Sequence, residues 1–269
     1  MTVRPPVLLT GAAGRLAAIL RPRLLAKYGG LRSTDRHPVT PLPNEEFLAC
    51  ELADMAALTR IAQGCRTVLH FAASAHHEDF PAILQGNIVG AYHVFEAARQ
   101  GGATRVVFAS SVHAVGFHPK DGMLDASAPH RPDGLYGASK CFGEDLARLY
   151  WDKHGIECAS LRIGMCGHGT SVGALAPVWL SEDDLWRLVE ACLDAPLVGF
   201  TVMYGASNNP DVPWHNGHAA HIPFVPKDRL DSIAFPADES AKRNKGNPAS
   251  LFIGGHFAAV DYDHPIGKR

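Results

Sequence analysis

The chain has 269 residues, of which 46% are hydrophobic and 19% charged, and its formal net charge is -2. That apolar content is enough for the core of one large α/β domain. The balanced charge does not favour a nucleic-acid partner, and no apolar run reaches the roughly 18 residues of a membrane-spanning helix.

The cysteines and histidines carry little sign of metal or disulfide chemistry. Six cysteines are scattered without a C-x-x-C pair, and the N-terminal stretch has no signal-peptide layout. We therefore expect buried free thiols in a cytoplasmic protein. His215, His218 and His221 are spaced three apart, but the neighbouring Gly and Pro residues disfavour a regular helix. We expect no metal site.

The first motif is a glycine turn near the N-terminus. An apolar run at residues 7–10 predicts a buried strand, and the sequence GAAGRLA at 11–17 leads into a helical pattern. Gly11 permits a tight turn, Gly14 lets the backbone approach a pyrophosphate, and Ala17 allows close helix packing. The free N–H groups at the helix start would bind the phosphates. The pattern predicts a dinucleotide site.

An acidic residue follows at the distance this interpretation requires. Residues 31–35 predict a second strand, which Asp35 closes about 20 residues after the glycines. A carboxylate there accepts hydrogen bonds from the ribose hydroxyls and repels a 2′-phosphate, which favours NAD over NADP. Arg36 comes next and could accommodate a phosphate. We expect NAD.

The middle of the chain continues the alternation of strands and helices. A third strand is expected at 47–51, where Glu51 and Leu52 could flank the adenine or Glu51 could be a solvated strand end. Further strands are expected at 67–73 and 105–111, with a helix between them from about 83 to 99. Ligands of such doubly wound sheets bind at the carboxyl ends of the strands. Several candidate residues occupy those ends: Gly11, Asp35, Ala72, Ser110 and Ser111.

Tyr136 and Lys140 begin the next predicted helix, which ends near His154, and they share one helical face. A nearby cation favours the phenolate, so the pair predicts a proton acceptor with a lowered pKa. The loop before this helix, residues 112–134, is long enough to be functional. After it we expect a strand at 157–162, an irregular segment at 164–180, a helix to about 194 and a strand at 200–204.

These motifs together resemble the extended short-chain dehydrogenase/reductase superfamily. The stretches LLTGAAGRL, ILQGNIVGAYHVFEAAR, VVFASSVHAVGFHP and RPDGLYGASKCFGEDLARLYWDKHG are similar to bacterial NAD-dependent uronate dehydrogenases. The resemblance implies oxidation of C1 of glucuronate or galacturonate to an aldaric acid lactone. Tyr136 would take the proton from the anomeric hydroxyl, Lys140 would lower the pKa of Tyr136 and hold the nicotinamide ribose, and Ser111 would donate to the reacting oxygen.

The resemblance also implies a set of contact residues. Cofactor contacts are expected from Gly11, Ala13, Gly14, Arg15, Leu16, Asp35, Arg36, Glu51, Leu52, Phe71, Ala72, Ala73, Asn87, Ser110, Tyr136, Lys140 and Ile163. Substrate contacts are expected from Ala75, His76, Ser111, Val112, His113, Tyr136, Met165 and Ala174.

The substrate side departs from the family pattern. The arginine that meets the sugar carboxylate in uronate dehydrogenases falls at Ala174, and the sequence from Ile163 to Trp186 contains no arginine or lysine. Other family polar positions are occupied by Met165, Val112 and Ala75. His76, His77 and His168 are new polar groups in the corresponding loops, so the sugar stays open.

We therefore expect a Rossmann-type α/β fold with about seven parallel strands over residues 1–269. A small substrate lobe should come mainly from about 165–195 and 206–269. The expected function is NAD-dependent oxidation of a sugar at C1, with uronate or a related aldose as substrate. The alternatives are a sugar epimerase or dehydratase that retains its NAD, and a non-catalytic NAD-binding protein. A homodimer or higher assembly is expected, with no nucleic-acid or membrane partner.

Overall fold

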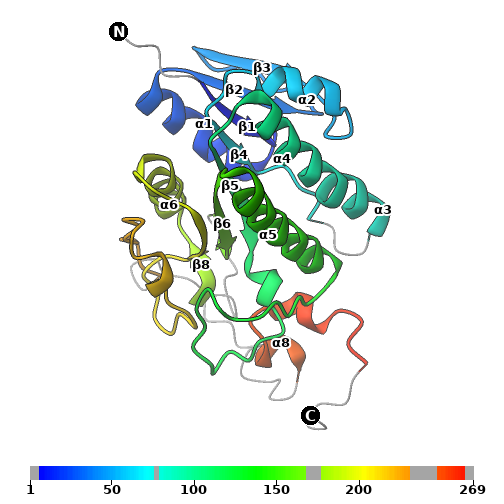
Figure 1. Cartoon of the computed structure of the whole chain (residues 1–269). Coiled ribbons are helices and arrows are strands. Elements are labelled where there is room, and N and C mark those ends of the chain that lie inside the picture. The colour runs from blue at the N-terminus through cyan, green and yellow to red at the C-terminus, as the bar shows by residue number, and fades with distance from the viewer. Residues whose placement is uncertain (1–5, 76–78, 168–176, 231–246, 264–269) are drawn as a thin grey trace.

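The computed structural model describes residues 6–75, 79–167, 177–230 and 247–263. Its centre is a sheet of seven parallel strands in the order β3-β2-β1-β4-β5-β6-β9 (Figure 1). The strands are β1 (Val7–Thr10), β2 (Leu31–Asp35), β3 (Glu45–Ala49), β4 (Thr67–His70), β5 (Arg105–Ser111), β6 (Glu157–Ile163) and β9 (Phe200–Gly205). The expected doubly wound α/β fold is confirmed.

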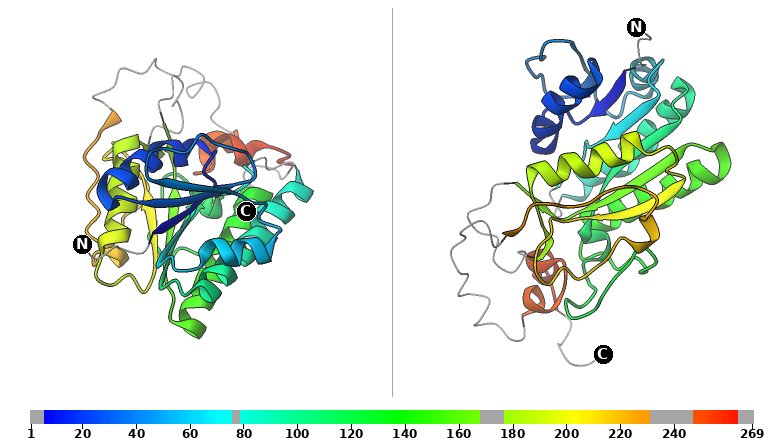
Figure 2. Two further views of the ribbon diagram at one scale, coloured as in Figure 1. Left: turned by 90° about the horizontal axis from the view of Figure 1, so that it is seen from above. Right: turned by 90° about the vertical axis from the view of Figure 1, so that its left-hand side faces the viewer.

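Helices cover both faces of the sheet, as the view from above in Figure 2 shows. Among the described residues, the helices of eight or more residues are α1 (Arg15–Tyr28), α2 (Met55–Ala62), α4 (Gly90–Gly101), α5 (Leu135–His154) and α6 (Glu182–Asp194). One buried cluster joins α1 and α6 to the sheet, and a second joins α2, α4 and α5 to its other face. Within the residues described, no helix is both long and apolar enough to span a membrane.

Several element boundaries differ from the sequence predictions, and three of the differences are larger than one residue at a strand end. The third strand lies at Glu45–Ala49, because an edge strand pairs on one side only and carries polar residues such as Glu45. The strand predicted to reach residue 73 ends at His70, since β1 ends at Thr10 and the backbone then turns away. The helix predicted from 83 begins as α3 (Phe80–Ile83), capped by Asp79, and passes through a π-helical turn at Leu84–Val89.

A small lobe sits beyond the carboxyl ends of the strands, and the C-terminal segment is part of it (Figure 1). α8 (Pro248–Leu251) and the residues after it run beside the loop that follows β5. Backbone N–H groups of Ile253 and Gly254 donate to the carbonyls of His118 and Gly116, at 3.0 and 2.9 Å. A third apolar cluster fills this lobe: Val112, Val115, Val178, Tyr204, Ala206, Trp214 and Ile253. A minor sheet of β7 (Met165–Cys166) and β8 (Trp179–Leu180) lies alongside.

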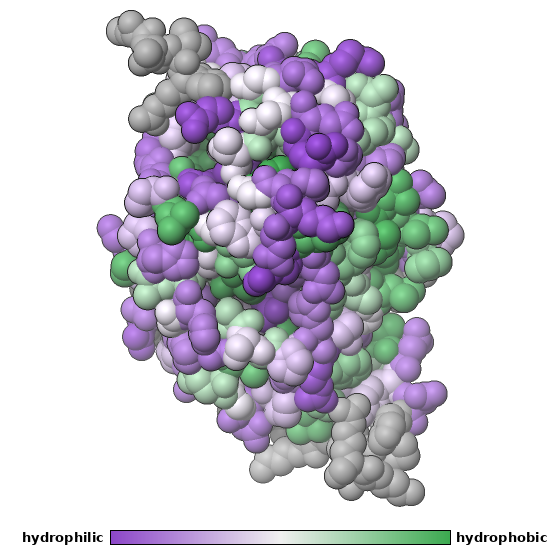
Figure 3. Space-filling model, in the orientation of Figure 1, coloured by the Kyte–Doolittle hydropathy of each residue, from purple (hydrophilic) through white to green (hydrophobic). Residues whose placement is uncertain are grey.

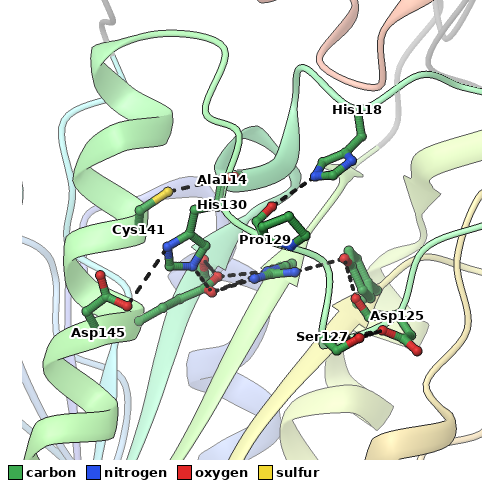
Figure 4. Close-up of polar contacts among 12 residues, drawn as sticks. Ala114, His118, Asp125, Ser127, Pro129, His130, Cys141 and Asp145 are labelled. Carbon is green, nitrogen blue, oxygen red and sulfur yellow. Dashed lines mark hydrogen bonds and ion pairs between the residues drawn. The ribbon is translucent and has the colours of Figure 1, made fainter.

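A buried ion pair joins Arg162 of β6 to Glu144 of α5. His130, from the loop before α5, lies beside it (Figure 4). Arg162 Nη2 donates to Glu144 Oε2 at 2.8 Å, and Arg162 Nη1 donates to the Tyr204 hydroxyl at 2.8 Å. Glu144 also accepts from Ser110 Oγ at 2.5 Å and lies 2.9 Å from His130 Nε2. Burial raises the pKa of Glu144, but these hydrogen bonds lower it more. The carboxylate therefore stays ionised in the interior.

Replacing Arg162 by Met should strongly destabilise the fold, because Glu144 would keep its buried charge without its main counter-ion. Breaking such a pair costs about 3–5 kcal/mol. Arg148→Met is the matched control, since the Arg148–Asp152 pair of α5 is exposed and such pairs contribute about 0.3–0.5 kcal/mol. Urea unfolding at neutral pH measures both. Equal losses in the two variants would contradict a central role for this pair.

Candidate active site

The β1–α1 turn forms one wall of the candidate site. Gly11 has φ +82°, and a Cβ built on it would come 2.6 Å from the backbone nitrogen of Ala72. The backbone N–H groups of Gly11 and Ala12 donate to the Thr34 carbonyl at 2.9 and 3.1 Å. The turn thus lies against the residues that follow β4 and against the end of β2, a close approach that a side chain at Gly11 would prevent.

The N-terminus of α1 is open to an anion. Gly14 precedes the helix without a capping side chain, and the first turn contains no acidic residue. Asp35 lies beside the turn, since its Oδ2 accepts from the Ala13 N–H at 3.0 Å and its Oδ1 from the His37 N–H at 2.9 Å. A bare helix start next to a partly exposed carboxylate fits a pyrophosphate and a ribose diol. The residues present therefore fit a dinucleotide.

The other predicted cofactor residues border the same edge of the sheet. Glu51 is exposed just after Cys50, whose backbone N–H donates to the Asp35 carbonyl at 3.0 Å. Arg36 is also exposed, and its Nε donates to the His37 ring. Leu52 and Phe71 are partly buried. The remaining positions divide by exposure: Ala13, Arg15 and Ala73 are exposed, Leu16 and Ala72 are partly buried, and Ile163 is buried in the core. Their contacts with a cofactor stay predictions.

Two of the predicted cofactor residues have their side chains engaged within the protein. Asn87 Oδ1 accepts from the Ser74 N–H at 2.7 Å, and its Nδ2 donates to the Ser74 carbonyl and to Ser139 Oγ, both at 2.9 Å. It therefore ties the segment after β4 to α5. The Ser110 hydroxyl donates inward to Glu144. These bonds direct both side chains into the protein, so any contact they make with a cofactor stays a prediction.

The three predicted catalytic residues meet at this edge. The Ser111 hydroxyl lies close enough to the Tyr136 hydroxyl to lower its pKa. Lys140 Nζ lies 5.4 Å from the centre of the Tyr136 ring and donates to the Ala109 carbonyl at 2.7 Å. Ser111 Oγ also accepts from the His113 N–H at 3.2 Å. A phenol, a hydroxyl and an amine therefore converge at the carboxyl ends of the strands, the edge that also carries the β1–α1 turn. This turn, residues 11–14, is called the nucleotide cradle below.

Burial changes the expected protonation of this pair. It raises the pKa of Tyr136 to about 12, a shift that the nearby Ser111 hydroxyl opposes and the Asp133 carboxylate increases. It lowers the pKa of Lys140 to about 7, while Glu144 opposes the shift. The sequence predicted a lowered Tyr136 pKa, and that direction is wrong for the protein alone. Loss of solvent outweighs the amine, which is only partly charged near neutral pH.

A neutral histidine lies behind the lysine. His70, at the end of β4, is fully buried, and its Nδ1 lies 2.8 Å from Thr10 Oγ1. Burial, followed by repulsion from Lys140, lowers the pKa of His70 to about 3. His70 was not predicted from the sequence, although a histidine at the end of the apolar run TVLH was a usable signal.

The substrate side is built from the loop after β5 and the C-terminal segment. His113 Nδ1 lies 2.7 Å from Asp133 Oδ2, and the His113 ring stacks on Phe257 at 4.2 Å between ring centres. Its edge faces the Tyr136 ring at 5.8 Å. Neither Asp133 nor Phe257 was among the site residues predicted from the sequence. Asp133 follows Pro132 just before the Tyr136 helix, whereas no local signal brings Phe257 to this place.

The other substrate predictions have mixed outcomes. Val112 was expected to contact substrate, but its side chain packs into the apolar cluster of the small lobe. Contact of Val112 with a substrate stays a prediction, since an apolar side chain beside Val115 and Ile253 is stabilised by this packing. Met165 is partly buried in β7 and Ala75 is exposed. His76, His77, His168 and Ala174 lie outside the described residues. Among described residues, no cluster of three or more His, Cys, Asp or Glu could hold a metal.

Comparison with known proteins agrees with this arrangement. The family model described as NAD dependent epimerase/dehydratase family matches residues 7–173. The chain therefore belongs to the NAD dependent epimerase/dehydratase family. It is 43% identical to a uronate dehydrogenase from Pseudomonas putida over 97% of this chain and 98% of that protein. It is 31% identical to an NAD-dependent glucose-6-phosphate dehydrogenase from Haloferax volcanii, over 87% of this chain and 99% of that protein.

A solved structure gives the same result. The crystal structure of uronate dehydrogenase from Agrobacterium tumefaciens, a tyrosine-to-alanine mutant complexed with NAD, superposes with a TM-score of 0.87. The two chains are 40% identical, and the match covers 98% of this chain and 99% of the other. Within its family, the chain thus resembles uronate dehydrogenases over nearly its whole length.

The Lys140→Met variant tests the burial of the amine. Because the folded pKa of about 7 lies below the ordinary 10.5, the unfolded chain binds one more proton between these pH values. Wild-type stability should therefore gain up to about 1.4 kcal/mol per pH unit from this group as pH rises above 7. The variant should lose that slope and its turnover.

Urea unfolding at pH 7, 8 and 9 measures the slope. Lys153→Met, an exposed change on the same helix, should keep the wild-type dependence. An unchanged slope in Lys140→Met would show that Lys140 is not buried as an uncharged amine.

Proposed function

We propose that this protein is an NAD-dependent sugar dehydrogenase that oxidises the anomeric C1 hydroxyl to a lactone, with a hexuronate as the first substrate to test. The observation that carries the proposal is the convergence of Ser111, Tyr136 and Lys140 beside the nucleotide cradle. The similarity to uronate dehydrogenases over 98% of the length of one of them supports the same reaction.

The residues divide the work as follows. Ser111 donates a hydrogen bond to the reacting oxygen and keeps it near Tyr136. The Tyr136 phenolate takes the proton of the C1 hydroxyl as the C=O bond forms. NAD, when bound, accepts the hydride that leaves C1. Each unit by which the Tyr136 pKa falls below about 12 represents about 1.4 kcal/mol of phenolate stabilisation, and a protonated Lys140 supplies part of it.

Two features bear on the sugar. The family's carboxylate-binding arginine falls at Ala174 by sequence, which argues for testing sugars other than uronates. The similarity to a glucose-6-phosphate dehydrogenase makes a phosphorylated aldose a second candidate. A panel of glucuronate, galacturonate, neutral aldoses and sugar phosphates therefore separates the substrate classes.

The alternative within the family is an epimerase or dehydratase that keeps its NAD and releases no NADH. The same assay separates it, because only a dehydrogenase accumulates NADH with one of these free sugars. A non-catalytic NAD-binding protein would bind the cofactor and convert none of the panel.

Tyr136→Phe should lower the rate of sugar-dependent NADH formation by roughly 10³-fold or more, because it removes the proton acceptor. Wild-type kcat should rise with pH until the phenolate forms in the complex, and this rise should be absent from any residual activity of the variant. NAD affinity, measured by fluorescence titration, should stay within a few-fold. Tyr150→Phe is the control on the same helix, because its hydroxyl donates only to Glu96. Unchanged turnover in Tyr136→Phe would contradict the mechanism.

The compartment and assembly are also proposals. All six cysteines are free and buried, as expected in a reducing compartment, and we propose that the protein works in the cytoplasm.

We further propose that it forms a homodimer through α5 and α4. Leu135, Phe142 and Leu149 are exposed at seven-residue spacing on α5, and Tyr92 of α4 is exposed as well. Figure 3 shows apolar surface over this side of the molecule. An apolar stripe at this spacing suits a second copy of the same helix.

The double variant Phe142→Glu/Leu149→Glu should be a monomer, because each copy would bring two charges into the contact. Light scattering after gel filtration gives the mass. Leu197→Glu, a change of an exposed leucine elsewhere, should leave the assembly intact. A wild-type protein that is monomeric at micromolar concentration would rule out the dimer.

A further inference from the structure

We propose that Asp133 is a positioning residue that acts through His113. It fixes the His113 ring with Nδ1 protonated, so that Nε2 accepts a hydrogen bond from the sugar hydroxyl beside the reacting one. The inference rests on the proposed function, since it assigns a part of the same site.

Asp133 is held in one place by the backbone around it. Its side chain is fully buried. A Cβ built on Gly116 or Gly254 would come within 2.0 or 1.6 Å of Asp133 Oδ2. The carboxylate thus fills the space that two glycines leave open, one in the loop after β5 and one in the C-terminal segment. The Gly254 N–H donates to the Gly116 carbonyl at 2.9 Å and closes this pocket.

The carboxylate has little reason to be there for stability alone. Asp133 Oδ1 is buried without a hydrogen-bond partner among the described residues. A buried carboxylate with an unsatisfied oxygen is costly, and an apolar side chain of similar size would avoid that cost. Among the described residues, the Asp133 side chain forms its hydrogen bond with His113 Nδ1, at 2.7 Å. We therefore infer that Asp133 acts on the site through His113.

His113 is restrained on several sides. Its ring stacks on Phe257, and its carbonyl accepts from the N–H groups of Gly116 and Asp133 at 3.3 and 3.4 Å. The ring is therefore fixed in orientation by stacking and by Asp133. With Nδ1 donating to the carboxylate, a neutral imidazole has its lone pair on Nε2. No described residue bonds to Nε2.

The position of His113 selects the hydroxyl. Its N–H donates to Ser111 Oγ, and its ring faces Tyr136 edge-on at 5.8 Å. The reacting hydroxyl lies between Ser111 and Tyr136 in the proposed mechanism. An acceptor next to that pair suits the hydroxyl on the neighbouring carbon, C2. An arrangement built on an acceptor favours a hydroxyl donor there over a deoxy position.

The experiment combines kinetics and spectroscopy on the full-length enzyme with NAD. Asp133→Asn removes the charge that holds the tautomer and should lower kcat/KM for the best sugar of the panel by roughly 10²-fold. NAD affinity should stay within about threefold. The loss should be small for the matching 2-deoxy sugar, which cannot donate to Nε2. Asp152→Asn, an exposed change on α5, should leave kcat/KM unchanged for both the sugar and its 2-deoxy form.

The dependence on His113 is tested by a double-mutant cycle. In His113→Gln the amide oxygen can accept a hydrogen bond without a partner that fixes a tautomer. Adding Asp133→Asn to this variant should therefore change kcat/KM by less than about threefold. Nitrogen NMR of ¹⁵N-histidine-labelled wild type, assigned with His113→Gln, should show Nδ1 protonated and Nε2 bare. This readout remains if Asp133→Asn fails to fold.

Three results would overturn the inference: additive losses in the double variant, equal losses on the 2-deoxy sugar, or an Nε2-protonated neutral ring in wild type. Failure of the proposed function looks different, because wild type would then reduce no NAD with any sugar while the NMR result could still be read.

Discussion

The close packing of α5 on β5 is the constraint on which the site depends. Gly143 allows it, since a Cβ there would come 2.2 Å from the Phe108 ring. Tyr136, Lys140 and Glu144 follow at intervals of four residues on one face of the helix. Close approach buries Lys140 and Glu144 and covers part of Tyr136, so each ionisable group depends on its neighbours for its charge. Glu144, held by Arg162, is the carboxylate that keeps a proton on Lys140 against the effect of burial.

The same constraint gives a site that is incompletely charged in the protein alone. Burial raises the pKa of Tyr136 and lowers that of Lys140, so the base is protonated and the amine is near its midpoint at neutral pH. A cation bound against the phenol would reverse the first shift. The positive charge of oxidised nicotinamide has the sign required. The enzyme would thus acquire its base when its oxidant binds, a sequence that limits proton transfer before the hydride can leave.

Much of this could be predicted from sequence where the signal is local. The glycine turn, Asp35 and the Tyr136 helix each follow from residues close in the chain, and they appear where they were expected. The signal failed for contacts between distant segments. Gly254 and Phe257 reach Asp133 and His113 only because the C-terminal segment pairs with the loop after β5. Val112 was assigned to the substrate by position, but burial in the lobe decided its place.

This division has a physical consequence for specificity. Proton and hydride transfer depend on α5 and the strand ends, which are packed into the two large clusters of the sheet. In the proposed site, sugar recognition would depend on loop residues and on the C-terminal segment, which pack in the small lobe around Val115 and Ile253. A substitution in the small lobe can move His113 relative to Tyr136 without disturbing the ion pair under Lys140. A change of substrate could therefore arise in the small lobe without altering the residues proposed for proton transfer. Asp133, which fills the space between Gly116 and Gly254, lies where the two loops that hold His113 meet.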